Sequence, residues 1–236
     1  MSNASNASPF TLVIANKNYS SWSMRPWVLL RQLGIPFREV MLKFQSREWD
    51  EQIARYSPSG LVPVLRIARN GADDVVWDSL AIMETLHERF PDRNVWPADP
   101  AARAFARSMA AEMHSGFRDL RGAMPMNIRA THAGAGTTPG TLANIRRIET
   151  LWAESRSRFG AGGDFLFGAF GAADAMYAPV VMRFNTYQPE LSPRAQRYCE
   201  AVRAAPAVRA WIEDALKETE FVADDEPYAA PQPAQA

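Results

Sequence analysis

The N-terminal third of the chain alternates short apolar runs with polar stretches. The run FTLVIA from Phe10 is short, apolar and rich in β-branched residues, so it predicts a buried strand. Residues 22–33 have helical composition and end at Gly34, with Pro36 two residues beyond, which are common stop signals of a helix. Residues 37–42 predict a second strand. This strand–helix–strand order favours a parallel strand pair crossed by the helix.

A second group of elements follows a polar, loosely helical stretch at residues 47–56. Residues 61–67, LVPVLRI, predict a strand, and residues 75–77 can pair back on it as a hairpin. Residues 80–90 then predict a helix that closes at Pro91. The first 90 residues therefore predict a βαβ unit followed by a ββα unit.

The remainder of the chain predicts helices. Apolar residues recur every three or four positions in several stripes, one of which runs from Met109 to Met124. The last residues are acidic and then rich in Pro, Ala and Gln, which is typical of disorder. The expected organisation is a flexible leader (1–9), an α/β domain (10–93), a linker (94–100), an all-helical domain (101–222) and a disordered tail (223–236).

Composition narrows the possible partners. The 26 basic and 26 acidic side chains of the 236 residues give zero formal net charge, so we expect neither nucleic acid nor an anionic membrane as a partner. No stretch of about 18 apolar residues predicts a membrane span, and the N-terminus lacks a secretory signal pattern. The single cysteine, Cys199, predicts a buried structural thiol in a cytoplasmic protein. The three dispersed histidines predict no metal site.

Three motifs lie at the ends of the predicted elements. They are YSSWSMR at residues 19–25, Val62-Pro63 before a strand, and WDSLAI at residues 77–82, which opens a helix. With the βαβ–ββα and helical domains, these motifs resemble the soluble glutathione transferases, and in particular a serine-type, zeta- and theta-like bacterial class. The resemblance implies a thioredoxin-like N-terminal domain, an all-helical C-terminal domain, glutathione as co-substrate, a homodimer and a role in detoxification.

The first motif is where a thiol would be activated. The N-terminus of a helix favours an anion such as a thiolate. A free thiol has a pKa of about 8.5, and one hydrogen bond worth about 1.5–3 kcal/mol lowers it by about one to two units. The resemblance places the sulfur contact five residues before Arg25, at Ser20, with Ser21 as the close alternative and Tyr19 as a third. The other interpretation is that these serines only cap the helix.

The other two motifs imply contacts to the peptide of glutathione. By resemblance, the bond before Pro63 is cis, and the Val62 backbone pairs with the cysteine of glutathione. Asp78 and Ser79 bind its γ-glutamyl carboxylate and amino group, although this pair is also an ordinary N-cap signature. A cation or amide after the second strand is usual for the glycyl carboxylate. The expected glutathione contacts are thus Val62, Pro63, Asp78, Ser79, Lys43 and Gln45.

The second substrate is expected between the domains. The resemblance assigns a pocket for a hydrophobic electrophile to the helix that contains Met113, His114 and Phe117. The predicted function is a glutathione transferase that holds the thiol as a thiolate for attack on this electrophile. The alternatives are a glutathione-dependent isomerase or dehalogenase at the same site, and a non-catalytic glutathione-binding protein.

One departure from the family pattern concerns folding. Gly171 lies where a Ser or Thr normally caps a helix, while Asp174 keeps the acidic partner three residues on. Because a glycine cap costs only a few tenths of a kcal/mol, we expect the helix to form.

Overall fold

The computed structural model describes residues 8–229 and contains one mixed sheet. Its strands are β1 (Phe10–Ile14), β2 (Arg38–Met41), β3 (Val64–Ile67) and β4 (Asp74–Trp77), in the order β2-β1-β3-β4. Strand β1 is parallel to β2 and antiparallel to β3, and β3 is antiparallel to β4. The predicted parallel pair and the predicted hairpin are therefore confirmed.

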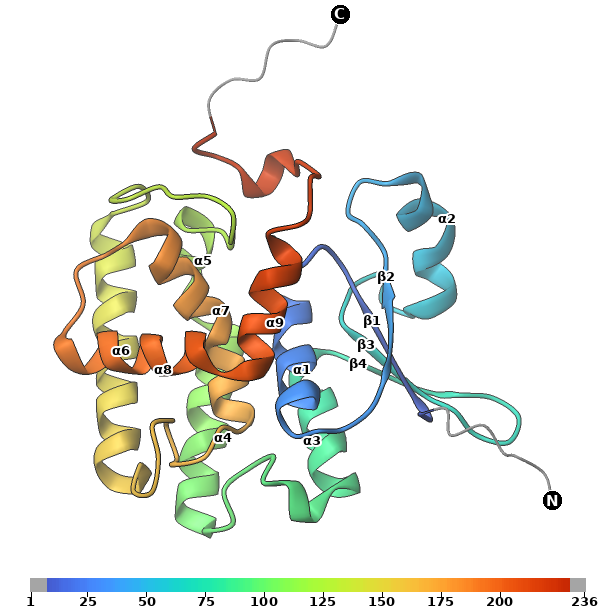
Figure 1. The fold of residues 1–236 in the computed structure, drawn as a ribbon, viewed down its shortest axis with the longest axis horizontal. Helices are drawn as coiled ribbons and strands as arrows, with labels where there is room; N and C mark the ends of the chain where they lie inside the picture. Colours follow the sequence, from blue (N-terminus) through green and yellow to red (C-terminus); the bar gives the residue numbers. More distant parts are fainter. Residues whose placement is uncertain (1–7, 230–236) are drawn as a thin grey trace, which may run out of the picture.

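Helices cover both faces of the sheet. Helices α1 (Ser21–Gln32) and α3 (Ser79–Arg89) lie on the face toward the rest of the chain, and α2 (Arg47–Tyr56) lies on the other face (Figure 1). The alternation along β1 explains this division: Leu12 belongs to the core under α1 and α3, whereas Val13 belongs to a small cluster under α2.

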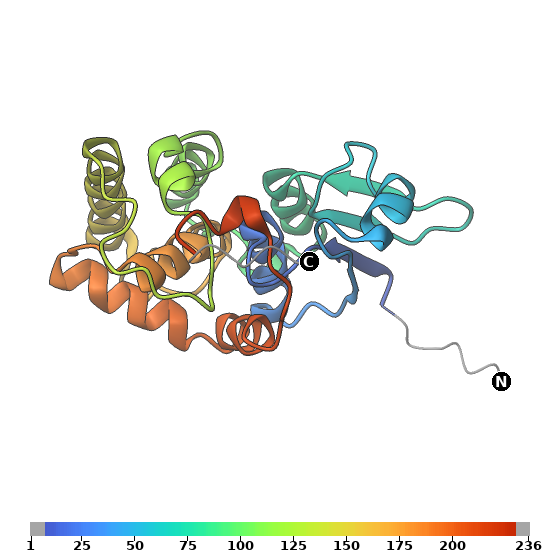
Figure 2. The same ribbon diagram turned by 90° about the horizontal axis from the view of Figure 1, so that it is seen from above.

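The helical domain lies beside α1 and α3 (Figure 2). A short 3₁₀ turn, η1 (Pro91–Arg93), leads into it. Its helices are α4 (Pro100–Ser115), α5 (Arg118–Ala123), α6 (Pro139–Phe159), α7 (Ala172–Tyr187), α8 (Pro193–Ala204) and α9 (Pro206–Ala215). Four of them begin at a proline, whose fixed φ suits the first helical position. Helix α7 is buried along almost its whole length and packs against α1 of the other domain.

The stripe predicted from Met109 to Met124 is broken into two helices. Gly116 ends α4, and Phe117 has a positive φ of 54°, so the chain turns before α5. A Cβ on Gly116 would lie 2.7 Å from the carbonyl oxygen of Glu112, which explains the glycine. Arg121 of α5 donates hydrogen bonds back to the carbonyl oxygens of His114 (3.1 Å) and Gly116 (3.4 Å) and so caps the end of α4.

The start of α7 is capped as the sequence predicts. The buried carboxylate of Asp174 accepts hydrogen bonds from the N–H groups of Gly171 and Leu166, both at 3.0 Å, and from the Tyr198 hydroxyl at 3.0 Å. A Cβ on Gly171 would lie 3.1 Å from the carbonyl oxygen of Val95. The close approach of the interdomain connection thus accounts for a glycine in place of the usual Ser or Thr.

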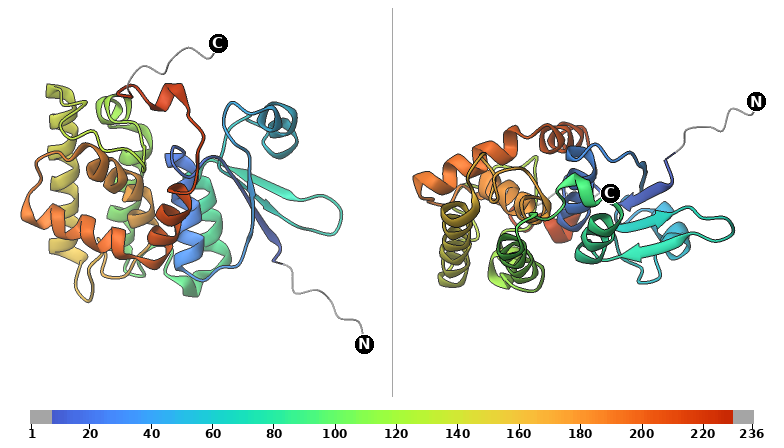
Figure 3. Two further views of the ribbon diagram at one scale, coloured as in Figure 1. Left: turned by 45° about the horizontal axis from the view of Figure 1, so that its top comes forward. Right: turned by 90° about the horizontal axis from the view of Figure 1, so that it is seen from below.

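The chain after α9 differs from the predicted disordered tail. Residues 217–229, called the C-terminal segment below, run from α9 across to α5 (Figure 3). They include the 3₁₀ turn η2 (Ala223–Asp225), and the Tyr228 hydroxyl donates to the carbonyl oxygen of Ala123 at the end of α5 (2.7 Å). Ordered contacts thus replace the predicted disorder at residues 223–229. Residues 230–236, and residues 1–7 of the predicted leader, lie outside the described residues.

None of the helices among residues 8–229 has the length and apolar character that crossing a membrane requires.

Candidate functional site

The sheet register gathers the predicted site residues at one edge. Val13 of β1 lies opposite Val64 of β3, and Val64 lies opposite Trp77 of β4. The loops that follow β1 and β4 therefore meet the loop that precedes β3. Ile14 of β1 also pairs with Met41, which adds the loop after β2. All three motifs and both residues predicted after the second strand lie in these four connections.

Ser20 forms the N-cap of α1. Its Oγ accepts a hydrogen bond from the N–H of Ser23 (3.3 Å) and donates one to the Ser23 Oγ (2.7 Å). The Ser23 Oγ also accepts from the N–H of Ala15 (3.1 Å), which fixes it at the end of β1. Ser20 is 4% exposed and lines a cleft. Ser20 therefore caps the helix, and the same residue lines the cavity.

The two alternatives to Ser20 have different surroundings. The Oγ of Ser21 accepts a hydrogen bond from Nη2 of Arg183 (3.3 Å). The Tyr19 hydroxyl instead donates to Oε1 of Glu226 (2.7 Å) and accepts from Nη2 of Arg129 (2.8 Å). Burial, reinforced by Glu226, raises the pKa of Tyr19. Ser21 thus stays beside Ser20 as a candidate, whereas the Tyr19 hydroxyl is committed to the C-terminal segment.

The second and third motifs adopt specific backbone conformations. The Val62–Pro63 bond is cis. Asp78 has a positive φ of 74°, and its Oδ1 accepts from the N–H of Leu80 (2.8 Å) at the start of α3. Its Oδ2 lies 2.6 Å from Nε2 of His114, whose N–H donates across the domain boundary. Asp78 therefore joins the N-terminus of α3 to α4.

An interdomain cleft of about 700 Å³ opens at this edge. Its lining comes from both domains and from the C-terminal segment: Tyr19, Ser20, Ser21, Trp22, Phe44, His114, Ser115, Arg118, Arg121, Gly122, Pro125, Met126, Arg183 and Asp225. Both candidate serines and His114 of the predicted set lie here.

Two predicted pocket residues do not line the cleft. Met113 is fully buried and Phe117 is 7% exposed, and both belong to the main apolar core. The turn at Gly116 explains this: it ends α4 just after His114, so Arg118 and Arg121 of α5 line the cleft in their place. The walls of the cleft are therefore more basic than the sequence stripe predicts.

The two residues predicted after β2, Lys43 and Gln45, lie outside the cleft lining. Lys43 forms an ion pair with Glu220 of the C-terminal segment, and Gln45 is exposed with a positive φ of 56°. The Glu220 hydrogen bond raises the pKa of Lys43. Of this loop only Phe44 lines the cleft.

A buried arginine lies beneath the cleft. Nη1 of Arg25 donates to the Oγ of buried Ser79 (3.4 Å), and its guanidinium lies 4.0 Å from the ring centre of Trp22. Burial, and then the charges of Arg183 and Arg121, lower the pKa of Arg25 to about 9. Arg25 thus stays charged at neutral pH and brings positive charge to Ser79. In the sequence, Arg25 served only as the reference position for Ser20, and neither Trp22 nor Arg183 was predicted to belong to the site. Their closeness to Arg25 and Ser21 arises from tertiary packing.

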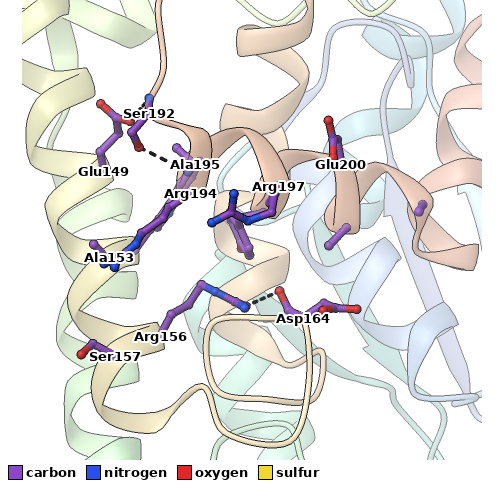
Figure 4. Close-up of a pocket in the computed structure, with 14 residues that line it drawn as sticks. Glu149, Ala153, Arg156, Ser157, Asp164, Ser192, Arg194, Ala195, Arg197 and Glu200 are labelled. Carbon is purple, nitrogen blue, oxygen red and sulfur yellow. Dashed lines mark hydrogen bonds between the residues drawn. The ribbon is translucent and has the colours of Figure 1, made fainter.

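A second cleft of about 700 Å³ lies between α6 and α8 (Figure 4). Its charges are mixed, since Arg194 and Arg197 share it with Glu149 and Glu200. Arg156 donates to the backbone carbonyl oxygens of residues 164 and 165. None of the three motifs reaches this cleft, so we assign the candidate site to the first one. Within residues 8–229, no group of His, Cys, Asp and Glu side chains is arranged to hold a metal ion.

Comparison with known proteins agrees with this arrangement. The family model described as glutathione S-transferase, N-terminal domain, matches residues 19–89, which contain all three motifs. The model described as glutathione S-transferase, C-terminal domain, matches residues 138–214. The chain belongs to the glutathione S-transferase family.

Individual relatives of this glutathione S-transferase are distant but align over most of its length. The glutathione S-transferase GstB of Escherichia coli is 24% identical over 206 residues, which cover 84% of this chain and 96% of the relative. A probable maleylacetoacetate isomerase of Caenorhabditis elegans is 25% identical over 177 residues, covering 73% and 78%.

Solved structures confirm the predicted fold of the transferase. A glutathione transferase homologue from Burkholderia, solved with bound glutathione, matches with a TM-score of 0.62 at 24% identity and covers 88% of this chain and 97% of its own. The omega-class transferase 2S of Trametes versicolor matches with a TM-score of 0.64 at 20% identity, covering 88% and 94%. The thioredoxin-like domain followed by a helical domain is therefore the fold of this chain.

Proposed function

We propose that this transferase binds glutathione along the sheet edge and holds its sulfur as a thiolate at the N-terminus of α1. The observation that carries the proposal is the register, which brings Ser20, the cis Val62–Pro63 bond and Asp78 to one edge beside the interdomain cleft. Two helix N-termini face this edge: that of α1 favours the thiolate, and that of α3 favours the γ-glutamyl carboxylate.

Ser20 can donate to a sulfur without losing its cap. The Ser23 Oγ accepts from the Ala15 N–H, so its own proton can turn to the Ser20 Oγ. The Ser20 proton is then free for an acceptor in the cleft, while its oxygen still accepts from the Ser23 N–H. Ser21 offers a similar donor, because a hydroxyl that accepts from the Arg183 guanidinium is polarised.

The remaining contacts would hold the peptide of glutathione. We assign the Val62 backbone to the cysteine part, and Asp78 and Ser79 to the γ-glutamyl end. Arg25 supports this end, because it places a buried positive charge on the Ser79 hydroxyl. Lys43 can meet the glycyl carboxylate only by exchanging its partner Glu220. When bound, glutathione supplies the nucleophilic sulfur, and its partner is an electrophile in the interdomain cleft.

We further propose that the protein is a cytoplasmic homodimer. The resemblance to the soluble transferases supports the dimer, and the single cysteine supports a reducing compartment.

Glutathione-dependent isomerisation is the second candidate. Several curated relatives carry the name maleylacetoacetate isomerase, among them the Caenorhabditis elegans protein. An isomerase would use the same thiolate and return it unchanged. The two functions differ in stoichiometry: a transferase consumes one thiol per turnover, whereas an isomerase consumes none.

Replacing the cap serine tests the proposal. Ser20→Ala removes the proposed donor, so the pKa of bound glutathione should rise by about one to two units. The measurement is thiolate ultraviolet absorbance of the glutathione complex against pH. Ser192→Ala is the matched control, because Ser192 caps α8 through the Ala195 N–H (3.3 Å), at the cleft between α6 and α8 and not at the candidate site.

Two outcomes separate the serines. An unchanged titration in Ser20→Ala with a raised pKa in Ser21→Ala would transfer the role to Ser21. If neither variant shifts the titration relative to Ser192→Ala, the proposed activation by a serine at this helix end is wrong.

A further inference from the structure

Four arginines gather at the interdomain cleft without a carboxylate partner. They come from three helices: Arg25 from α1, Arg118 and Arg121 from α5, and Arg183 from α7. In the described part of the chain none of them forms an ion pair, whereas Arg66, Arg69, Arg107, Arg147 and Arg158 all do. The chain as a whole has zero formal net charge, so this is a local excess of positive charge.

Neutral groups hold Arg25, Arg121 and Arg183 in place and leave their charge uncompensated. Nε of Arg183 donates to the carbonyl oxygen of Met124 (2.8 Å), and Arg121 donates to two carbonyl oxygens at the end of α4. The centre of the Trp22 ring lies 4.7 Å from the guanidinium of Arg121 and 4.0 Å from that of Arg25, so this one ring contacts both arginines. Packing has therefore fixed the donors before any ligand arrives.

The charges repel one another. Burial and then Arg121 lower the pKa of Arg183 to about 10, and burial and then Arg118 lower the pKa of Arg121. Arg183 is 4% exposed, so water screens its charge poorly. An anion bound between them would relieve this repulsion and gain charge-assisted hydrogen bonds.

One acid from the chain itself approaches this cluster. Asp225 of the C-terminal segment lines the same cleft. It is near enough for its negative charge to raise the pKa of Arg183, but the two residues form no ion pair. Burial raises the pKa of Asp225 to about 6; the charge of Arg183 opposes this rise, and the charges of Asp224 and Glu226 add to it. A carboxylate is thus already brought toward the arginines, and it is only partly stabilised there.

We propose that the second substrate of this transferase is an electrophile that carries a carboxylate, and that Arg118, Arg121 and Arg183 bind this group. The inference rests on the proposed function and specifies its substrate class. It replaces the hydrophobic electrophile that the sequence predicts. The apolar faces of Trp22, Phe44 and Met126 in the same lining suit the body of such a molecule.

The reaction with a carboxylate-bearing aryl chloride shows the chemistry. The thiolate forms a carbon–sulfur bond, the carbon–chlorine bond breaks, and chloride leaves with the electron pair. The thiol proton has already passed to solvent. The arginines act only on the distant carboxylate, so they set affinity and orientation.

A matched pair of substrates tests the inference. The pair is 4-chloro-3-nitrobenzoate and its neutral methyl ester, with each kcat/KM divided by the uncatalysed rate constant with glutathione. We expect the normalised value of the acid to exceed that of the ester by about tenfold, as one charge-assisted contact provides. Equal values, or a preference for the ester, would overturn the inference.

Variants of the exposed residue Arg118 test whether the arginines cause the preference for the acid. The Arg118 side chain is exposed and forms no ion pair among the described residues, so Arg118→Glu should fold normally. We expect this variant to lower the acid-to-ester ratio by about tenfold. Arg118→Lys keeps the charge and should retain most of the ratio. Arg194→Glu in the cleft between α6 and α8 is the matched control and should leave the ratio unchanged. A ratio insensitive to Arg118→Glu contradicts the assignment.

Direct binding separates this inference from the proposed function. Calorimetry with 4-methyl-3-nitrobenzoate, which has no leaving group, measures the anion site without turnover, and calorimetry with glutathione measures the other site. Binding of the benzoate but not of glutathione would reject the proposed function and keep the anion site. Binding of glutathione that Arg118→Glu weakens, with an unchanged acid-to-ester ratio, would assign the arginines to glutathione and overturn the inference.

Discussion

Asp78 shows how a single residue connects the two halves of the cleft. Its φ of 74° lies in a region that side chains rarely adopt, at a cost of about 1–3 kcal/mol. This backbone directs Oδ1 to the N–H of Leu80 and Oδ2 to His114. The strain is therefore maintained by contacts from α3 and α4. A ligand amino group that engages Asp78 must compete with His114, which itself lines the cleft.

Asp225 makes anion binding dependent on pH. Because its pKa is raised to about 6, it is ionised at neutral pH and becomes protonated as the pH falls toward 5. Protonation removes a negative charge beside Arg183, so 4-methyl-3-nitrobenzoate, which ionises at about pH 4, should bind about two- to fivefold more tightly near pH 5 than near pH 7.5. The charges of the neighbouring Asp224 and Glu226 raise the pKa of Asp225, and the charge of Arg183 lowers it.

The matched variant for this effect is Asp225→Asn. It should bind the benzoate more tightly at neutral pH and lose most of the change between the two pH values, as measured by calorimetry. An equally steep pH dependence in Asp225→Asn would mean that another group controls binding.

At the level of residues, the local sequence pattern predicted the residues that cap helices better than it predicted the other residues of the site. Ser20 and Asp78 were predicted because each caps a helix and because neighbouring letters complete a motif. Arg183 had no such signal: it reaches Ser21 only because α7 packs against α1, 162 residues away in sequence. Contacts of this kind depend on tertiary packing and leave no local spacing to recognise.

At the level of elements, periodicity predicted strands and helices but not their interruptions. The apolar stripe from Met109 to Met124 continues through the turn at Gly116 and Phe117, because both α4 and α5 bury their apolar faces in the same core. The glycine and the capping by Arg121 make the break. This break makes the cleft basic, because it places Arg118 and Arg121 of α5 in the cleft lining.

The start of α7 should be a major contributor to stability. Asp174→Ala would leave the Tyr198 hydroxyl and the N–H groups of Gly171 and Leu166 without their acceptor in a buried region, so we expect a loss of about 3 kcal/mol in the free energy of unfolding. Asp99→Ala is the control, because Asp99 caps α4 through one bond to the Ala102 N–H (2.7 Å) and should cost about 1 kcal/mol. Urea denaturation measures both. Equal losses would show that the buried network adds nothing to an ordinary cap.

At the level of the whole molecule, the C-terminal segment connects the domains. Oε1 of Glu218 accepts from the N–H of Lys17 (2.6 Å), and Oε2 accepts from the N–H of Asn18 (3.0 Å). Arg129 of the helical domain donates to the carbonyl oxygens of Glu218 and Glu220. The loop before α1 thus depends on residues about 200 positions away. Composition predicted disorder for part of this segment, because a sequence of acidic and small residues does not reveal the tertiary contacts that order it.

Removing these contacts should lower the stability of both domains together. Glu218→Ala leaves two buried backbone N–H groups without an acceptor, so we expect the free energy of unfolding to fall by about 1–3 kcal/mol. Glu213→Ala, at an exposed position on α9, should change little. Thermal unfolding followed by circular dichroism and by tryptophan fluorescence should give one common transition in both variants. Separate transitions in Glu218→Ala would show that the domains unfold independently.

The contacts of Lys17 limit how this protein can be divided for experiments. Its Nζ lies 3.1 Å from Glu39 and 2.8 Å from Asp214 of α9, over the rings of Trp27 and Trp211. A fragment cut within residues 94–100 would leave this nearly buried cation without Asp214 and expose the apolar face of α1 that α7 covers. We therefore expect the two family domains to fold as one unit, so that an excised N-terminal domain aggregates unless the helical fragment is supplied with it.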